Sequence, residues 1–213
     1  MSVTIILIVL TSLISYQAFQ DRVLYERLTF RPYTIKRNGE WYRFLTHGFI
    51  HSNQGWEHLL INMFVLYQIG RAIEYYFGEL FGMPLGIILY VGLYLAAIIV
   101  SSIPSYFKHQ DSPHYGAVGA SGATSALVFA FILFDPWQWF IFPPLPGVLL
   151  AIAYVWYSRY KSQQNNDNIG HDAHLYGALF GLFATLAFVW FLQPAYLDGI
   201  INNLMSPKGP GYF

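Results

Sequence analysis

A single serine stands at the start of an apolar run in the stretch GAVGASGATSALVFAFIL, residues 116–133. Ser121 is followed by Gly122 and preceded at two positions by Gly119, and we expect these glycines to leave room for the carbonyl group of a substrate to approach closely. If a helix begins here, the free amide hydrogens and the positive dipole end of its first turn surround the hydroxyl. Taken alone, such a run of small residues most often serves helix packing. Beside a general base, the same features suit a nucleophilic serine whose own backbone amide stabilises an oxyanion.

The stretch AHLYGALFG offers a base for such a serine. His174, Gly177 and Gly181 are spaced by three and four residues, so they share one face of a helix. The two glycines form a GxxxG pair, which lets another backbone approach much closer than a leucine face would. An imidazole is the usual general base near neutral pH. We therefore expect His174 to reach Ser121 across two closely packed helices.

Two further polar residues fall on a third apolar segment. His58 and Asn62 are four residues apart, so they project from one helical face and can converge on one small group. In a catalytic interpretation they stabilise the oxyanion together with the serine amide, where a single donor is worth about 10² to 10³ in rate. In a structural interpretation they bond to each other or to a neighbouring helix. The sequence leaves both interpretations open.

The elements that must position these residues are membrane helices. Hydrophobic residues make up 55% of the chain, charged residues only 10%, and the mean hydropathy is positive, which together predict an all-α polytopic membrane protein. We expect one domain over residues 1–213. The predicted spans are residues 3–19, 57–77, 85–103, 119–134, 147–157 and 172–192.

The regions around the first span need separate interpretation. Residues 3–19 lack the basic flank and the small-residue cleavage site of a signal peptide, so we expect this span to be retained. Residues 20–56 are too polar to cross a membrane and too aromatic for a free linker. This composition predicts a partly embedded loop at the membrane interface.

Composition also argues against several other classes of protein. The net charge is zero, so no nucleic-acid partner is expected, and no cysteine is present to form a disulfide or a thiolate metal site. A metal-dependent membrane oxidase is the alternative raised by HGFIH and HDAH, because each motif can place two imidazoles on one helix face. Such sites usually need more histidines and carboxylates, and the zinc motif HExxH is absent. We therefore expect neither a metal nor another cofactor.

Three segments, taken in order, resemble the rhomboid family of intramembrane serine proteases: HGFIHSNQGWEHLLINMFVLYQIGRAIE, the GASG around Ser121 and the AHLYGALFG around His174. The resemblance covers nearly the whole chain and implies the six-helix bundle of that family. It implies hydrolysis of peptide bonds in or near transmembrane segments of substrate proteins, by a Ser121–His174 dyad. By the same resemblance, the oxyanion site consists of the serine amide, His58 and Asn62. No acidic third member is implied, since Asp172 is two residues from the histidine and faces elsewhere on a helix.

The resemblance also implies supporting residues and a membrane orientation. His51 and Arg43 match positions that support the embedded first loop in the family. Transmembrane substrates are expected to enter laterally from the lipid bilayer, and the site is expected to open to the extracytoplasmic side of a bacterial inner membrane. The positive-inside rule indicates the reverse orientation, because six arginines and lysines lie in the first loop. We follow the family, since lipid headgroups and Asp21, Glu26 and Glu40 can neutralise these charges.

One departure from the family pattern bears directly on the dyad. Rhomboids often have an aromatic residue four positions after the serine, stacked on the catalytic histidine, where this chain has Ser125. We expect Ser125 to bond back to the carbonyl of Ser121. The orientation of His174 must then depend on Tyr176 or on an aromatic residue of a neighbouring helix. The spacer SNQGWE in the first segment is also longer than the commonest spacing in the family.

A catalytically inactive relative, which binds membrane proteins without cleaving them, would have the same fold. The intact serine and histidine favour an active protease over such a binder. The sequence gives no indication of the oligomeric state.

Overall fold

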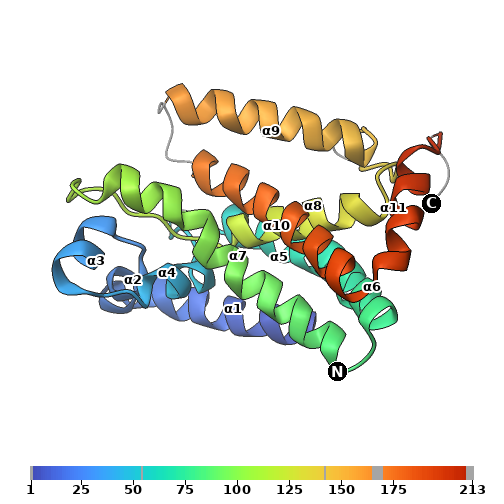
Figure 1. The fold of residues 1–213 in the computed structure, drawn as a ribbon. Helices are drawn as coiled ribbons and strands as arrows, with labels where there is room; N and C mark the ends of the chain where they lie inside the picture. The colour runs from blue at the N-terminus through green and yellow to red at the C-terminus, as the bar shows by residue number, and fades with distance from the viewer. Residues whose placement is uncertain (1, 54, 142, 165–169, 210–213) are drawn as a thin grey trace.

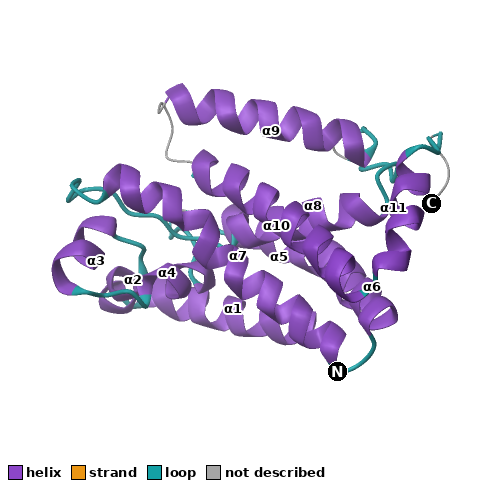
Figure 2. Ribbon diagram, in the orientation of Figure 1, coloured by secondary structure: helices purple, strands orange, loops and turns teal. Residues whose placement is uncertain are grey.

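The structure is a computed structural model that describes residues 2–53, 55–141, 143–164 and 170–209. In these ranges the chain is all-α, with two isolated β-bridges and no strand (Figure 2). The helices form a bundle in which α8 lies in the middle and α9 runs along one side (Figure 1). All residues of the predicted dyad and oxyanion site lie toward the same end of the bundle.

Helices occupy all six predicted spans. They are α1 (Val3–Gln20), the continuous run of α5 (Glu57–Val65), η2 (Leu66–Gly70) and α6 (Arg71–Phe81), α7 (Leu85–His109), α8 (Ser121–Phe134), α9 (Gly147–Gln164) and α10 (His171–Leu192). Among the described helices, α1, α7 and α10 are long and apolar enough to cross a membrane on their own, and α8 is a shorter apolar helix. These apolar helices make the chain a multi-pass membrane protein.

Three of the helices extend several residues further than the hydropathy predicted, and one of them is α6, which runs to Phe81 where the predicted span ended at residue 77. Helix α7 continues through Pro104, and α9 continues past Tyr157. Proline lacks the N–H that would bond the carbonyl four residues earlier, and membrane helices tolerate this loss where neighbouring groups satisfy the backbone. Beyond Tyr157 the sequence turns polar, but lysine and glutamine still favour a helix. Of the predicted loop 158–170, residues 158–164 belong to α9, and residues 165–169 lie outside the described part of the chain.

The first loop folds into short helices at one end of the bundle: α2 (Arg22–Leu28), α3 (Pro32–Asn38), α4 (Arg43–Thr46) and the turn η1 (His47–Phe49). Arg43 links α4 to α2 and to the residue that follows α2, because its Nη1 donates to the carbonyls of Glu26 and Thr29, each at 2.7 Å. Phe30 is fully buried and pairs with Ala117 through two backbone hydrogen bonds of 3.0 Å. The first loop therefore holds the segment that leads into α8.

The acidic residues named for the first loop are bound within the protein. Glu26 pairs with Arg31, and Glu40 accepts from Arg43 Nε at 2.6 Å. Asp21 has a different role from the predicted one, since its carboxylate accepts from two backbone amides and caps the start of α2. Two of the three predicted carboxylates thus neutralise first-loop arginines.

At the opposite end of the bundle, the carboxylate of Glu74 caps the start of α1. Glu74 of α6 accepts hydrogen bonds from the hydroxyls of Ser2 and Thr4 and from the amides of Val3 and Thr4, at 2.6 to 3.0 Å. It thereby supplies the cap for the first turn of α1 from another helix. At the same end, Trp137 Nε1 donates to the carbonyl of Leu204 at the end of α11 (Leu197–Leu204), which follows the turn η3 (Pro194–Tyr196).

Candidate active site

Ser121 is the first residue of α8, so its amide lies among the free N–H groups of the first turn. The preceding segment is held by the first loop: the Gly119 amide donates to the His47 carbonyl at 2.9 Å. Gly119 has a φ of 121°, in a region that side-chain-bearing residues rarely adopt. The start of α8 therefore depends on both a glycine conformation and contacts to a loop distant in sequence.

His51 connects the same segment to α1. The Ala120 amide donates to His51 Nε2 at 3.4 Å, and the other ring nitrogen lies 2.9 Å from Ser15 Oγ, which in turn donates to the Phe49 carbonyl. These partners assign the neutral tautomer with its proton on Nδ1. Burial, and to a smaller extent His58, lower the pKa of His51 to about 3, so the ring is neutral at physiological pH. His51 thus positions the residue next to Ser121.

Helices α8 and α10 contact each other through backbone at two glycines. A Cβ atom on Gly177 would lie 2.2 Å from the Gly122 carbonyl oxygen, and one on Gly181 would lie 2.1 Å from that of Ala126. Both pairs have the same offset, because 177 − 122 and 181 − 126 each equal 55, so the helices run parallel. We call these four residues the glycine seam. The predicted close-approach face is present.

The parallel seam brings the two predicted dyad residues to the same end of the bundle. Ser121 is at the start of α8 and His174 is in the first turn of α10, next to Ala173, whose carbonyl oxygen lies 3.4 Å from a Cβ position on Gly122. Both dyad side chains are partly exposed. Among the described residues no hydrogen bond joins the Ser121 hydroxyl to the His174 ring. Such bonds are often long until a substrate is bound.

His58 and Asn62 approach α8 from the side of α5. Asn62 Nδ2 donates to the His58 carbonyl at 2.7 Å, and its Oδ1 accepts from Thr124 Oγ1 at 3.1 Å. Thr124 Oγ1 also lies 3.2 Å from the Ser121 carbonyl oxygen. The bonds expected from the structural interpretation therefore exist, and they hold the amide group beside the first turn of α8. An amide nitrogen has two hydrogens, so one remains for another acceptor.

Other groups of the protein occupy the space beside Gly119 and Gly122, whereas the sequence predicted that a substrate carbonyl would enter it. A Cβ atom on Gly119 would lie 2.5 Å from the His58 ring, and one on Gly122 would lie 2.2 Å from Ser101 Oγ. The space predicted for a substrate is filled because the chain has used both glycines for packing. Gly119 seats the histidine of α5, and Gly122 seats α7 and α10.

The prediction for Ser125 was wrong in its partner. Its hydroxyl lies 2.5 Å from the Tyr154 hydroxyl of α9, and Thr124 is the residue that bonds back to the Ser121 carbonyl. The Tyr154 ring is stacked with the His174 ring, with centroids 6.4 Å apart and planes 26° apart. Tyr176 is 42% exposed and points away from the dyad. The ring stacked on the histidine therefore comes from an adjacent helix, the second of the two predicted sources, while the His171 ring of α10 meets it edge-on at a centroid distance of 6.1 Å.

Asp172 faces away from the dyad, as predicted from its helical position. Its carboxylate accepts from Lys108 Nζ at 3.0 Å and from the Ser162 hydroxyl. It thereby links α10 to the ends of α7 and α9. It contributes no third member to a catalytic set.

Three residues that support the site escaped sequence reasoning: Ser15, Thr124 and Tyr154. Ser15 is a buried hydroxyl inside an apolar span, which is the same signal that singled out His58 and Asn62. Thr124 is hidden among other small polar residues after Ser121. Tyr154 is one of several aromatics in AYVWYSRYK, and nothing in their spacing distinguishes it.

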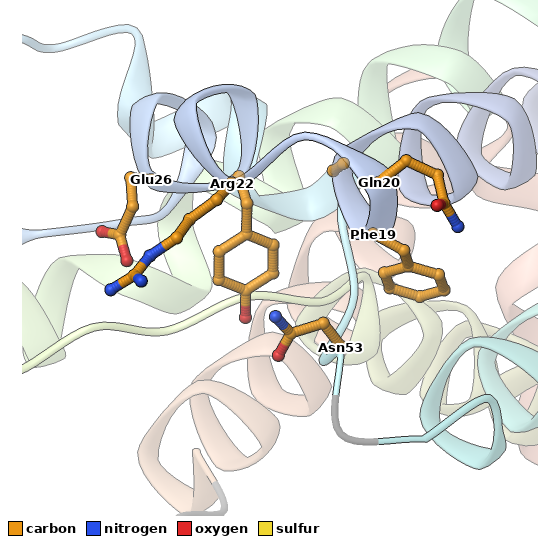
Figure 3. A pocket seen from close by; sticks show the side chains of 7 residues that line it. Phe19, Gln20, Arg22, Glu26 and Asn53 are labelled. Carbon is orange, nitrogen blue, oxygen red and sulfur yellow. The ribbon is translucent and has the colours of Figure 1, made fainter.

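A cavity of about 500 Å³ lies apart from this site, where α1 meets the first loop (Figure 3). None of the predicted site residues lines it; its lining consists of Ala18, Phe19, Gln20, Arg22, Tyr25, Glu26 and Asn53. In the described part of the chain, no group of three or more histidines and carboxylates is placed to hold a metal ion.

Comparison with known proteins supports this assignment of the fold. The family model for the rhomboid domain matches residues 38–191, from the first loop to the end of α10. A curated relative is "Rhomboid-like protein 11, chloroplastic" from Arabidopsis thaliana, with 30% identity over 168 residues. The alignment covers 72% of this chain and 53% of the relative, so the chain matches about half the length of that protein.

Proposed function

Because this chain belongs to the rhomboid family, we propose that it is an intramembrane serine endopeptidase with Ser121 as the nucleophile and His174 as the general base. The observation that carries the proposal is the parallel glycine seam, which sets the starts of α8 and α10 side by side. Its substrates are proteins with transmembrane segments, which reach the site from the bilayer.

In the proposed reaction, Ser121 Oγ attacks the carbonyl carbon of a peptide bond while His174 accepts the hydroxyl proton. His174 then gives this proton to the departing amide nitrogen, and the acyl group stays on the serine. A water molecule, deprotonated by the same imidazole, attacks the acyl carbon and restores the hydroxyl. The imidazole has to be neutral at the start of each half-reaction.

The oxyanion formed in both half-reactions needs hydrogen-bond donors that are already in place. The Ser121 amide at the first turn of α8 supplies one donor, assisted by the positive end of the helix dipole. The remaining N–H of Asn62 and the His58 ring supply others from α5. Gly119 supports this arrangement, because only a glycine lets the His58 ring lie so close to the start of α8.

Covalent labelling with a fluorophosphonate tests the dyad. We expect the purified parent protein to form an adduct on Ser121, identified by mass spectrometry, and to cleave single-span membrane proteins reconstituted with it. Ser121→Ala and His174→Ala should abolish both reactions. Ser102→Ala is the matched control, since it removes a buried hydroxyl that bonds only carbonyls of its own helix. Undiminished cleavage by Ser121→Ala would refute the proposed dyad, whereas a folded parent protein that neither labels nor cleaves would favour a non-catalytic binder.

We also propose that the catalytic end of the bundle faces the extracytoplasmic side. This proposal follows the orientation of the rhomboid family, whereas the six arginines and lysines of the first loop indicate the reverse by the positive-inside rule. The chain has no cysteine, so a single His114→Cys or Ser206→Cys variant reports one end of the bundle without background. A membrane-impermeant maleimide applied to intact cells should label only the His114→Cys variant.

A further inference from the structure

Tyr154 lies between the helix of the nucleophile and the ring of the base. Its hydroxyl is 2.5 Å from Ser125 Oγ, one turn after Ser121 on α8, and its ring stacks with His174 at a centroid distance of 6.4 Å. Phe129 packs against the same tyrosine at 5.6 Å. The ring is therefore fixed relative to α8 at two points, by a hydrogen bond and by an aromatic contact.

Of the other aromatic residues of α9, Tyr157 packs edge-on against His171 of α10 at 5.8 Å, whereas Trp156 and Tyr160 are exposed. Trp156 is 67% exposed and stacks with Tyr160 at 5.7 Å, on the side away from α8. Ser125, by contrast, is buried on α8. A buried hydroxyl needs a hydrogen-bond partner, and the Tyr154 hydroxyl satisfies this requirement for Ser125 while Ser125 satisfies it for the tyrosine. The hydrogen bond between Ser125 and Tyr154 therefore stabilises this contact in addition to the packing of the rings.

We propose that Tyr154 is a positioning residue, held by Ser125, which orients the His174 imidazole toward Ser121. The inference rests on the proposed function, since it assigns a support to the same dyad. A general base has to point a ring nitrogen at the proton it removes, and a displacement of about 1 Å costs roughly 10²-fold in rate. An aromatic ring beside the imidazole restricts its rotation, and aromatic pairs are favourable at centroid distances of about 4.5–7 Å.

The ring stacked on His174 belongs to α9, whereas the nucleophile belongs to α8. A tyrosine on α8 would move with the nucleophile, whereas Tyr154 moves with α9. If α9 shifts away from α8, the hydrogen bond to Ser125 and the stack on His174 are lost together. The T-shaped contact of the His171 ring, at a centroid distance of 6.1 Å, lies within α10 and would remain, so the stacking restraint on the base is the part that requires α9 to be docked against α8.

The test measures the rate of fluorophosphonate labelling as a function of probe concentration, which separates the maximal rate from the apparent affinity for the probe. Tyr154→Leu removes the ring and the hydroxyl, and we expect the maximal rate to fall by roughly 10- to 100-fold with an unchanged affinity. Tyr154→Phe keeps the ring, and we expect a fall of roughly 2- to 10-fold. Trp156→Leu, on the outer face of the same helix, is the matched control and should react like the parent.

A double-mutant cycle tests the hydrogen bond. Ser125→Ala and Tyr154→Phe remove the same bond from opposite sides, so the double variant should react no more slowly than the slower single variant. Multiplying effects would show that the two residues act independently and would overturn the role given to Ser125.

Three outcomes are decisive for the inference as a whole. A Tyr154→Leu variant that reacts as fast as the parent would overturn it. So would a loss of rate fully explained by a lower folded fraction, measured by thermal unfolding in the same detergent. A parent protein that fails to react at all would refute the proposed dyad itself, and the inference with it, which distinguishes the two failures.

Discussion

The helix that carries Ser121 is held in two different ways. On the side of α10, the glycine seam brings backbone against backbone, without any titratable or rotatable group between the helices. Elsewhere α8 and the segment before it are held by side chains, through Ser125–Tyr154 and through Ala120–His51. We call these two contacts the side-chain tethers. The seam fixes the spacing of the dyad helices, whereas the tethers set orientation and can be loosened one at a time.

The largest effect is expected at the seam. In Gly177→Ala, the new Cβ would lie 2.2 Å from a backbone oxygen of α8, which cannot turn aside, so the helices must separate. We expect labelling of Ser121 to slow by roughly 100-fold, as for a displacement of about 1 Å. The free energy of unfolding should fall by about 1–3 kcal/mol, a typical cost of overpacking.

Gly92→Ala is the matched control for the seam, because a Cβ atom at this α7 position would meet nothing within 4 Å. We expect this variant to keep the labelling rate and to be at least as stable as the parent, since alanine favours a helix over glycine. Equal behaviour of the Gly92→Ala and Gly177→Ala variants would remove the distinction between the seam and an ordinary helix surface.

Acid should weaken the His51 tether and leave the seam unaffected. The imidazole of the unfolded chain takes up its proton near the ordinary pKa of 6.5, whereas that of folded His51 does so only near about 3. Between these values the unfolded state binds more protons, so stability is full above pH 6.5 and decreases as the pH falls. The decrease is at most about 1.4 kcal/mol per pH unit for each such histidine.

Thermal unfolding at several pH values between 7.5 and 4.5 checks this expectation. Buried His47, whose pKa burial lowers to about 4, contributes in the same direction and remains in every variant. His51→Asn should therefore be less stable than the parent at pH 7.5 but show a shallower decrease toward acid. Parallel pH profiles for the two proteins would show that His51 does not titrate on unfolding.

The smallest effect is expected at the end of α9. Asp172→Asn breaks the ion pair with Lys108 and weakens the bond from Ser162, but these groups are partly exposed to solvent. We expect at most about 1 kcal/mol of lost stability, and less at high salt. Labelling of Ser121 should slow by less than about threefold. A larger loss of labelling rate than in Tyr154→Phe would mean that α9 is held in place mainly by the contact of Ser162, near its C-terminal end, with Asp172.

The glycine seam could be predicted from the sequence, whereas the side-chain tethers could be predicted only in part. Gly177 and Gly181 were identified correctly as a close-approach face, because helical periodicity alone places them on one side of α10. The six helices followed from hydropathy, with errors after Phe77, at Pro104 and after Tyr157, where polar residues continue a helix. These features depend on neighbours within a few residues along the chain.

The tethers were only partly predictable. The family pattern indicated that an aromatic ring was missing at Ser125, and a neighbouring helix was named as one possible source, but the bond to Tyr154 was not foreseen. Asn62 was assigned to the right region, while its bond to Thr124 was not. Contacts of this kind join residues 29 to 69 positions apart, and their spacing in the chain carries no signal.

The sequence by itself determined that this is an all-α membrane protein, that its apolar segments form helices, and which small faces let two of them approach. These follow from local propensity, hydropathy and helical period. Only the tertiary structure decided that the glycines beside Ser121 seat His58 and Ser101, and that the ring beside His174 comes from α9. The physical reason is that a glycine defines an empty space, while the group that fills it is selected by the packing of all the helices together.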